Sequence, residues 1–140
     1  LSFKETSDKK FIFNYDQDAN SKKITKSIEI VYGLRNFIGN ANKFSSSKVF
    51  VTLKSNNEFT EVIIEDDGTG YPNDIISKIG EPYLKAFNKK NQSKTGLGLG
   101  LFIGKTLLEK NFAQINCRNS KTRGGAEVII KWNNEDLFKI

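Results

Sequence analysis

Two asparagines and a lysine form the first group of side chains whose types and spacing suggest a chemistry. Asn36, Asn40 and Lys43 stand at positions i, i+4 and i+7, so in a helix they project from nearly the same side. Amide oxygens suit a hard cation such as Mg²⁺ that bridges to nucleotide phosphates, and a lysine neutralises phosphate charge. Taken alone, the stripe is more typical of a solvated face on an amphipathic helix.

The second group is a run of carboxylates followed by two glycines, from Glu65 to Gly70. Alternation along a strand places Asp66 on the same side as Val62 and Ile64, the expected core side, and its two carboxylate neighbours on the other. A buried carboxylate is costly unless it meets a donor. An adenine amino group is such a donor, whereas guanine presents a carbonyl oxygen there. In isolation the run also fits an ordinary Asp-Gly turn.

The third group is an alternating run of glycine and leucine over residues 96–101, at the end of a lysine-rich loop and the start of a helix. Glycines let the backbone approach phosphates, and a helix N-terminus offers free N–H groups, so phosphate contact is favoured over close helix packing. The P-loop pattern is excluded because Leu99 stands where it needs a glycine. The dinucleotide-binding fingerprint is excluded because a polar loop, not a strand, precedes the run.

Four lysines lie in the loop before these glycines. Cations on such a segment would close over a triphosphate or simply favour solubility, and their individual roles stay open. They are Lys85, Lys89, Lys90 and Lys94.

Composition excludes several classes of function. The 140 residues contain no histidine and one cysteine, which excludes Ser-His-Asp catalysis, histidine-ligated metals and disulfide frameworks. The net charge of +6 favours an anionic partner, but the lysines scatter instead of forming one nucleic-acid-binding patch. No apolar run approaches the about 20 residues of a spanning helix, and no signal peptide opens the chain. Because the chain starts at Leu1 and lacks methionine, we expect a fragment of a longer protein.

Strands are expected wherever apolar residues alternate. The first strand covers 10–15, a hairpin joins strands 49–53 and 62–66, and a second hairpin joins strands 113–117 and 126–132. Cys117 alternates with Ala113 and Ile115, which is typical of a small core residue and not of a redox sensor.

Helices are expected over 25–45, 73–79 and 97–110, and a loop over 81–95. The first helix should bury a stripe with steps of three and four, made of Ile24, Ile28, Val31, Leu34, Ile38 and Ala41. The element order predicts an α+β fold, a two-layer α/β sandwich in which helices cover one face of a mixed, mostly antiparallel sheet. We expect a linker remnant over 1–10, one domain over 11–132 and a C-terminal tail over 133–140.

In their order, the motifs closely resemble the catalytic ATP-binding domain of bacterial sensor histidine kinases, within the ATPase superfamily that also contains gyrase. The resemblance rests on Asn-x-x-x-Asn-Ala-x-Lys-Phe from Asn36, Asp-x-Gly-x-Gly from Asp66, Gly-Glu-Pro-Tyr from Gly80 and the glycine-leucine run from Gly96. The fuller phrases Gly33–Phe37, Gly80–Tyr83 and Leu99–Glu109 are similar to a subgroup of redox-responsive global regulators.

The resemblance implies a Bergerat-type ATP-binding fold with ATP and Mg²⁺ as cofactors. It implies that Asn36 and Asn40 ligate Mg²⁺ and act in catalysis with Lys43, that Asp66 binds adenine, and that the segment between Tyr83 and Gly96 is the ATP lid. The further cofactor-binding positions that it implies are Phe44, Gly68, Gly70, Tyr83, Lys94, Gly96, Leu97, Gly98, Leu99 and Gly100.

The activity implied is transfer of the γ-phosphoryl group to a histidine on a separate dimerisation domain of the same parent protein, with a response regulator downstream. Asn36 stands where gyrase-like ATPases carry a glutamate base, which favours transfer over hydrolysis. The resemblance also implies a cytoplasmic part of a membrane-anchored sensor, with no nucleic-acid or membrane contact of its own. A nucleotide-binding regulatory module without transfer, or a serine kinase of the anti-sigma-factor type, remains an alternative.

Overall fold

The computed structural model describes residues 9–15, 28–72, 76 and 96–137. Its strands are β1 (Lys10–Tyr15), β2 (Lys48–Ser55), β3 (Phe59–Asp66), β4 (Gln114–Asn119) and β5 (Ala126–Asn133), and its helices are α2 (Ile28–Phe44), α3 (Gly96–Lys110) and α4 (Asn134–Leu137). The helix expected over 73–79, apart from Ile76, and the loop expected over 81–95 lie outside the described residues, as do residues 25–27 of the first helix.

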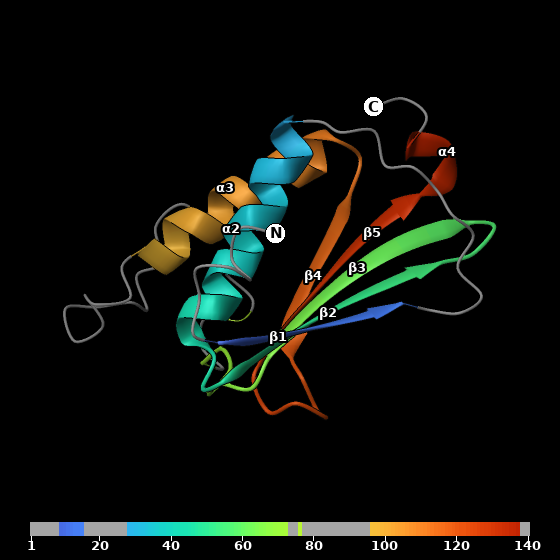
Figure 1. The fold of residues 1–140 in the computed structure, drawn as a ribbon. Helices are drawn as coiled ribbons and strands as arrows, with labels where there is room; N and C mark the ends of the chain where they lie inside the picture. The colour runs from blue at the N-terminus through green and yellow to red at the C-terminus, as the bar shows by residue number, and fades with distance from the viewer. Residues whose placement is uncertain (1–8, 16–27, 73–75, 77–95, 138–140) are drawn as a thin grey trace.

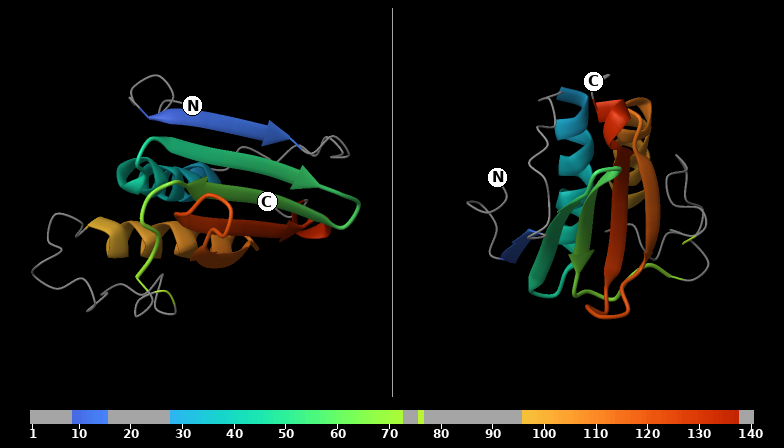
Figure 2. Two further views of the ribbon diagram at one scale, coloured as in Figure 1. Left: turned by 90° about the horizontal axis from the view of Figure 1, so that it is seen from below. Right: turned by 90° about the vertical axis from the view of Figure 1, so that its right-hand side faces the viewer.

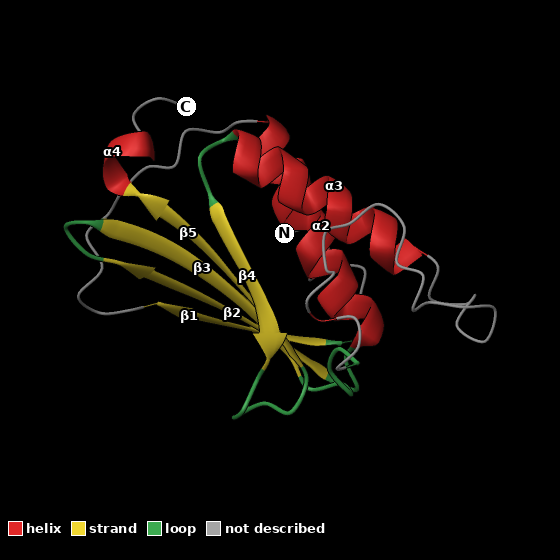
Figure 3. Ribbon diagram, turned by 180° about the vertical axis from the view of Figure 1, so that it is seen from behind, coloured by secondary structure: helices red, strands yellow, loops and turns green. Residues whose placement is uncertain are grey.

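The strands form one sheet in the order β1-β2-β3-β5-β4. Strand β1 pairs with β2 in parallel, and the other pairings are antiparallel. Helices α2 and α3 cover one face of this sheet (Figure 1, Figure 3). The expected two-layer α+β fold with a mixed, mostly antiparallel sheet is therefore confirmed.

Helix α2 buries a face that differs in phase from the expected one. Ile28 is 74% exposed and Val31 36% exposed, although both were expected in the core. The reason is Gly33, where a Cβ would lie 2.7 Å from Cγ of Leu108, so that α3 packs directly against this side of α2. The residues that α2 does bury are Ile30, Gly33, Phe37, Ile38 and Ala41.

Helices α2 and α3 lie side by side (Figure 2), and they approach closely at Gly33 and Gly104. A Cβ on Gly104 would lie 2.9 Å from the Phe37 ring, so a side chain there would push the helices apart. Near the start of α2, Lys110 Nζ lies 2.8 Å from Glu29 Oε2. These contacts fix the register in which α3 passes the polar side of α2.

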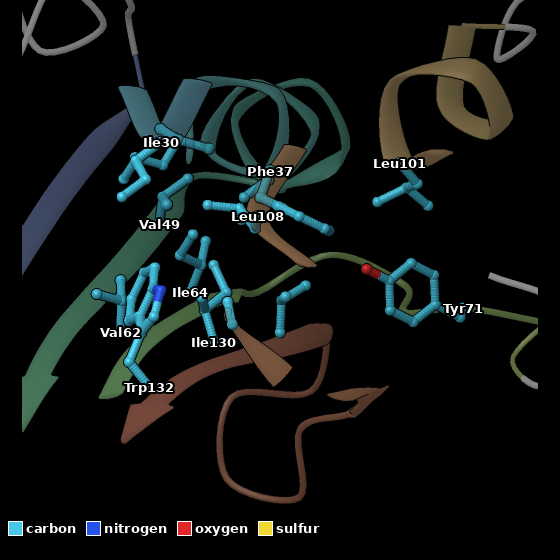
Figure 4. Close-up of a cluster of buried hydrophobic side chains, with 14 of the residues drawn as sticks. Ile30, Phe37, Val49, Val62, Ile64, Tyr71, Leu101, Leu108, Ile130 and Trp132 are labelled. Atoms are coloured by element: carbon cyan, nitrogen blue, oxygen red, sulfur yellow. The ribbon is translucent and has the colours of Figure 1, made fainter. Parts of the chain in front are cut away.

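The core lies between the helix layer and the sheet, and Figure 4 shows its main side chains. Trp132 is fully buried, and its indole N–H donates to Asn111 O at 3.0 Å, so the polar edge of this large side chain is satisfied. The other fully buried large side chains come from α2, α3 and the central strands: Phe37, Val49, Ile64, Leu101, Leu108 and Ile130.

Packing continues beyond residue 132, where we expected a tail. The four residues of α4 form a helical turn, and Leu137 is buried in the core. Asn134 accepts a hydrogen bond from Thr60 Oγ1 and donates one to Asn56 O, each at 2.7 Å. The turn is thereby tied to the β2–β3 hairpin. None of the helices in the described ranges is long and apolar enough to cross a membrane.

Candidate functional site

The end of β3 carries a buried carboxylate whose geometry is fixed by main-chain donors. Asp66 is 3% exposed on the helix-facing side of the sheet, as alternation predicted. Its Oδ1 accepts hydrogen bonds from Gly68 N at 2.8 Å and from Ala126 N at 3.3 Å. Burial raises the pKa of Asp66 above its ordinary value, and the two N–H donors offset part of that rise. We call Asp66, Gly68, Gly125 and Ala126 the carboxylate cluster.

Two glycines let the main chain reach this carboxylate. A Cβ on Gly68 would collide with the carbonyl oxygen of Phe44, and a Cβ on Gly125 would collide with Asp66 Oδ1 and lie 2.7 Å from Gly68 N. Glycine is therefore required at both positions by close approach of the backbone. Gly125 was not among the expected site residues, because its sequence context predicted only a turn before β5.

The neighbouring Asp67 points to the other side and holds the turn between α2 and β2. Its Oδ1 accepts hydrogen bonds from the N–H groups of Ser46, Ser47 and Lys48 at 2.9 to 3.0 Å, and its Oδ2 accepts one from Ser47 Oγ at 2.9 Å. Partial desolvation raises the pKa of this carboxyl, but the hydrogen bonds together outweigh it and lower the pKa to about 2. Asp67 thus fixes the segment that follows Phe44.

We expect Asp67→Asn to make the stability of the protein less sensitive to acid. A carboxylate whose folded pKa is about 2, against an ordinary 3.8, stabilises the fold above pH 4 and loses that contribution as the pH falls to 2. After allowance for solvent screening, the unmodified chain should lose about 1–2 kcal/mol more than the variant between pH 4.5 and 2. Urea unfolding across that range measures the difference. Glu58→Gln, which removes an exposed carboxylate, is the control, and equal acid sensitivity in all three proteins would contradict the assignment.

The amides of α2 meet the first turns of α3. Asn36 Nδ2 donates to Tyr32 O at 2.8 Å, so Oδ1 is the amide atom that faces away from the backbone of α2. A Cβ on Gly100 would lie 3.5 Å from Asn40 Nδ2, 3.6 Å from Asn36 Oδ1 and 3.7 Å from Asn40 Oδ1, so the amide groups of both asparagines lie over this glycine. Asn40 Nδ2 is buried and has no hydrogen-bond partner among the described residues. We call Asn36, Asn40 and Gly100 the amide cluster.

The amide cluster bears on whether Asn36 and Asn40 form a binding site or only a solvated helix face, which the sequence left open. The stripe of Asn36 and Asn40 is not simply a solvated face, because α3 covers it. Hard cations such as Mg²⁺ prefer oxygen ligands and share their remaining positions with phosphate and water. The two amide oxygens over Gly100, with an Asn40 Nδ2 that finds no partner among the described residues, therefore fit a cation and phosphate oxygens at this point.

The glycine-leucine run lies inside α3, which begins at Gly96, whereas we expected the helix to follow its first glycine. The first four N–H groups of a helix have no acceptor within the helix, and they carry the positive end of its dipole. These groups belong to residues 96–99, one turn from Gly100. The start of α3 therefore adds main-chain donors suited to an anion next to the amide cluster.

The last turn of α2 connects the two clusters. Asn40 and Phe44 are one turn apart, and the Phe44 carbonyl oxygen packs against Gly68 of the carboxylate cluster. Lys43 is exposed, and its ammonium lies 5.4 Å from the centre of the Phe44 ring. A carboxylate, two amides and a lysine thus line one continuous stretch of α2 and β3.

The other expected site residues fall into three sets. Gly70 has φ +80° and lies against Asn119 at the end of the turn after Asp66. For Gly96, Leu97, Gly98 and Leu99 the structure gives the helical backbone only, while Tyr83, Lys94 and the other lysines of that loop lie outside the described residues.

Comparisons with known proteins give matches to one family and to solved structures of the same fold. Residues 25–136 match the family model described as "Histidine kinase-, DNA gyrase B-, and HSP90-like ATPase". The chain is 38% identical over 108 residues to the sensor histidine kinase RegB of Cereibacter sphaeroides, which covers 74% of this chain and 23% of that protein. The chain therefore spans less than a quarter of the length of this relative.

Two solved structures share the fold at lower identity. The mycobacterial sensor histidine kinase MprB superimposes with a TM-score of 0.74 and 23% identity, over 94% of this chain and 87% of that one. Full-length ShkA in complex with AMPPNP superimposes with a TM-score of 0.64 and 21% identity, over 87% of this chain and 25% of that one.

Proposed function

Since the chain belongs to the family of histidine kinase-, DNA gyrase B- and HSP90-like ATPases, we propose that it binds Mg-ATP and transfers the γ-phosphoryl group to a histidine on a separate dimerisation domain of its parent sensor kinase. The observation that carries this proposal is the amide cluster, where the amide groups of Asn36 and Asn40 lie over Gly100 in the first turns of α3. A response regulator would receive the phosphoryl group next. We place this part of the parent protein in the cytoplasm.

The carboxylate cluster selects the base. Because Oδ1 of Asp66 is engaged by Gly68 and Ala126, Oδ2 remains to accept a hydrogen bond from the amino group of adenine. Guanine would present an oxygen to this carboxylate and be repelled. The ring of Phe44 and the turn through Gly70 would flank the base.

The amide cluster and α3 hold the phosphates. Asn36 and Asn40 would ligate Mg²⁺ through their oxygens, and the N–H groups at the start of α3 would bond phosphate oxygens. Bound Mg²⁺ supplies neutralisation of the phosphate charge that develops during transfer. Lys43 adds a positive charge on the same side of α2, and we propose the same role for Lys94. Asn36 cannot abstract a proton, so this site positions the phosphates without activating water.

The acceptor must come from another segment. The chain contains no histidine, so the isolated chain cannot phosphorylate itself on that residue. Labelled ATP and Mg²⁺ with an isolated histidine-bearing dimerisation domain of the parent provide the test. We expect label on that domain that is lost in acid, as phosphohistidine is. Acid-stable label would favour a serine kinase, and tight nucleotide binding without label would favour a regulatory module.

We expect Asn40→Ala to lower the rate of transfer at least about a hundredfold, because an electrostatic contact that strengthens in the transition state is lost. The variant should also bind the nucleotide with little dependence on Mg²⁺. Asn42→Ala is the matched control, since it removes an asparagine of the same helix that is not among the groups nearest to Gly100. Equal rates and equal Mg²⁺ dependence in the two variants would contradict the role of Asn40.

A further inference from the structure

Tyr71 follows the carboxylate cluster, and both of its main-chain polar groups are hydrogen-bonded to β4. Its N–H donates to Asn119 Oδ1 at 2.7 Å, and Asn119 Nδ2 donates to its carbonyl oxygen at 3.0 Å. Its phenol lies beside the side chain of Cys117, and burial raises the pKa of that thiol to about 11. Cys117 and Asn119 are two residues apart, so they project from the same face of β4.

The side-chain amide of Asn119 bonds both main-chain groups of Tyr71, as the backbone of a neighbouring strand would. Gly70, the residue before it, has φ +80°, which L side chains rarely adopt, and a Cβ there would lie 2.7 Å from Asn119 Oδ1. The chain therefore turns tightly around this amide, and the site of close contact admits only glycine. The side chain of Asn119 is therefore an integral part of the turn, and it is not merely a surface polar group next to it.

The segment that Asn119 holds leads directly from the nucleotide-selecting carboxylate. At its start, Gly68 N–H donates to Asp66 Oδ1, and three residues later Tyr71 is fixed by both of its main-chain groups. Tyr71 is 9% exposed, and Figure 4 shows it with Leu101 of α3 at one end of the core. Only Thr69 and Gly70 separate Gly68 from the Tyr71 backbone that β4 holds.

We propose that Asn119 is a positioning residue for nucleotide binding, which holds the backbone of Tyr71 and thereby keeps the Gly68–Tyr71 turn in the conformation that binds the adenine side of the nucleotide. This inference rests on the proposed function. Asn119 acts through the turn and does not itself touch the ligand. Loss of its amide should therefore weaken recognition of the nucleoside and spare recognition of the phosphates.

The test compares two ligands and two asparagines of one strand. Asn119→Ala should weaken binding of an ATP analogue about tenfold, the cost of leaving main-chain groups unpaired. Binding of Mg-tripolyphosphate should change less than twofold. Asn116→Ala, which removes an exposed asparagine from the other face of β4, should leave both affinities unchanged. Asn119→Asp keeps the acceptor for Tyr71 N–H and should fall between the two.

Isothermal titration calorimetry at a temperature well below the midpoint of thermal unfolding gives these affinities. Hydrogen exchange at the Tyr71 amide should become faster in Asn119→Ala only. An ATP-analogue affinity within twofold of the Asn116→Ala control, or an equal loss for tripolyphosphate, would overturn the inference while leaving the proposed function intact. If Asn119→Ala does not fold, Asn119→Asp decides by the same comparison. If the unmodified chain binds neither ligand, the proposed function fails and the inference fails with it.

Discussion

Replacing Asp66 with asparagine is expected to lower the affinity for an ATP analogue by about a hundredfold, because a charge-assisted hydrogen bond is replaced by a donor facing a donor. The N–H groups of Gly68 and Ala126 hold one oxygen of this side chain. The amide oxygen of an asparagine would take that place and turn its NH₂ group to the adenine amino group. Fluorescence competition with a labelled nucleotide measures the change.

The stability of the Asp66→Asn variant separates lost recognition from lost folding. Burial makes the charged carboxylate costly, as its raised pKa indicates, so a neutral amide is not expected to lower the unfolding temperature. Glu61→Gln, on the same strand but the opposite face, is the matched control and should bind the nucleotide normally. Asp66→Asn with unchanged affinity would exclude the carboxylate from base recognition.

Replacing Gly125 with alanine is expected to have the second large effect. Its Cβ would collide with the main-chain and side-chain oxygens of Asp66, and those atoms cannot move without breaking the bonds to Gly68 and Ala126. Overpacking against backbone atoms should cost about 3 kcal/mol of unfolding free energy. The surviving folded fraction should bind the ATP analogue at least about tenfold more weakly, since the carboxylate is displaced.

Gly124→Ala is the control for this substitution. Gly124 has φ +88°, but a Cβ there would meet no atom within 4 Å, so alanine should cost only about 1–2 kcal/mol of backbone strain. Its affinity for the nucleotide should stay within twofold of the unmodified chain. Urea unfolding and nucleotide titration of both variants provide the comparison. If Gly125→Ala is the milder of the two, close approach at the carboxylate cluster is not a requirement.

Local periodicity was sufficient to predict most elements and the orientation of Asp66. The two hairpins alternate apolar and polar residues, and alternation alone put Asp66 on the side of Val62 and Ile64, where it lies. The buried face of α2 was predicted less well. Its apolar residues recur at steps of three and four on two neighbouring faces of the helix, so the spacing alone does not decide which face is buried. The choice between them is made by Gly33, whose role becomes visible only when Leu108 of α3 packs on it.

The residues that sequence reasoning missed act across large separations in the chain. Gly125 and Asn119 reach the segment after Asp66 because β5 pairs with β3 and β4 pairs with β5. No local pattern encodes that pairing. A double glycine before a strand and an asparagine ending another are the available signals, and both are more typical of turns. The sequence pattern did not predict the buried turn α4 either, because four mostly polar residues show no periodicity.

The absence of histidine defines what this domain contributes. We propose that its described residues supply a carboxylate for the base and amides, a lysine and helix N–H groups for the phosphates, while the acceptor belongs to another segment. Similarity to RegB and the motif phrases of its sequence lead us to propose that the parent is a redox-responsive regulator. Cys117 does not supply that response, because it is part of the core packing and its thiol pKa is raised to about 11.

Titration of the unmodified chain with a non-hydrolysable ATP analogue and its GTP counterpart, each with and without Mg²⁺, tests whether this domain binds Mg-ATP selectively. We expect saturable binding of the ATP analogue below millimolar concentration, strengthened by Mg²⁺, and binding of the GTP analogue at least about a hundredfold weaker. No binding of the ATP analogue at millimolar concentration, or equal affinity for the two bases, would contradict it.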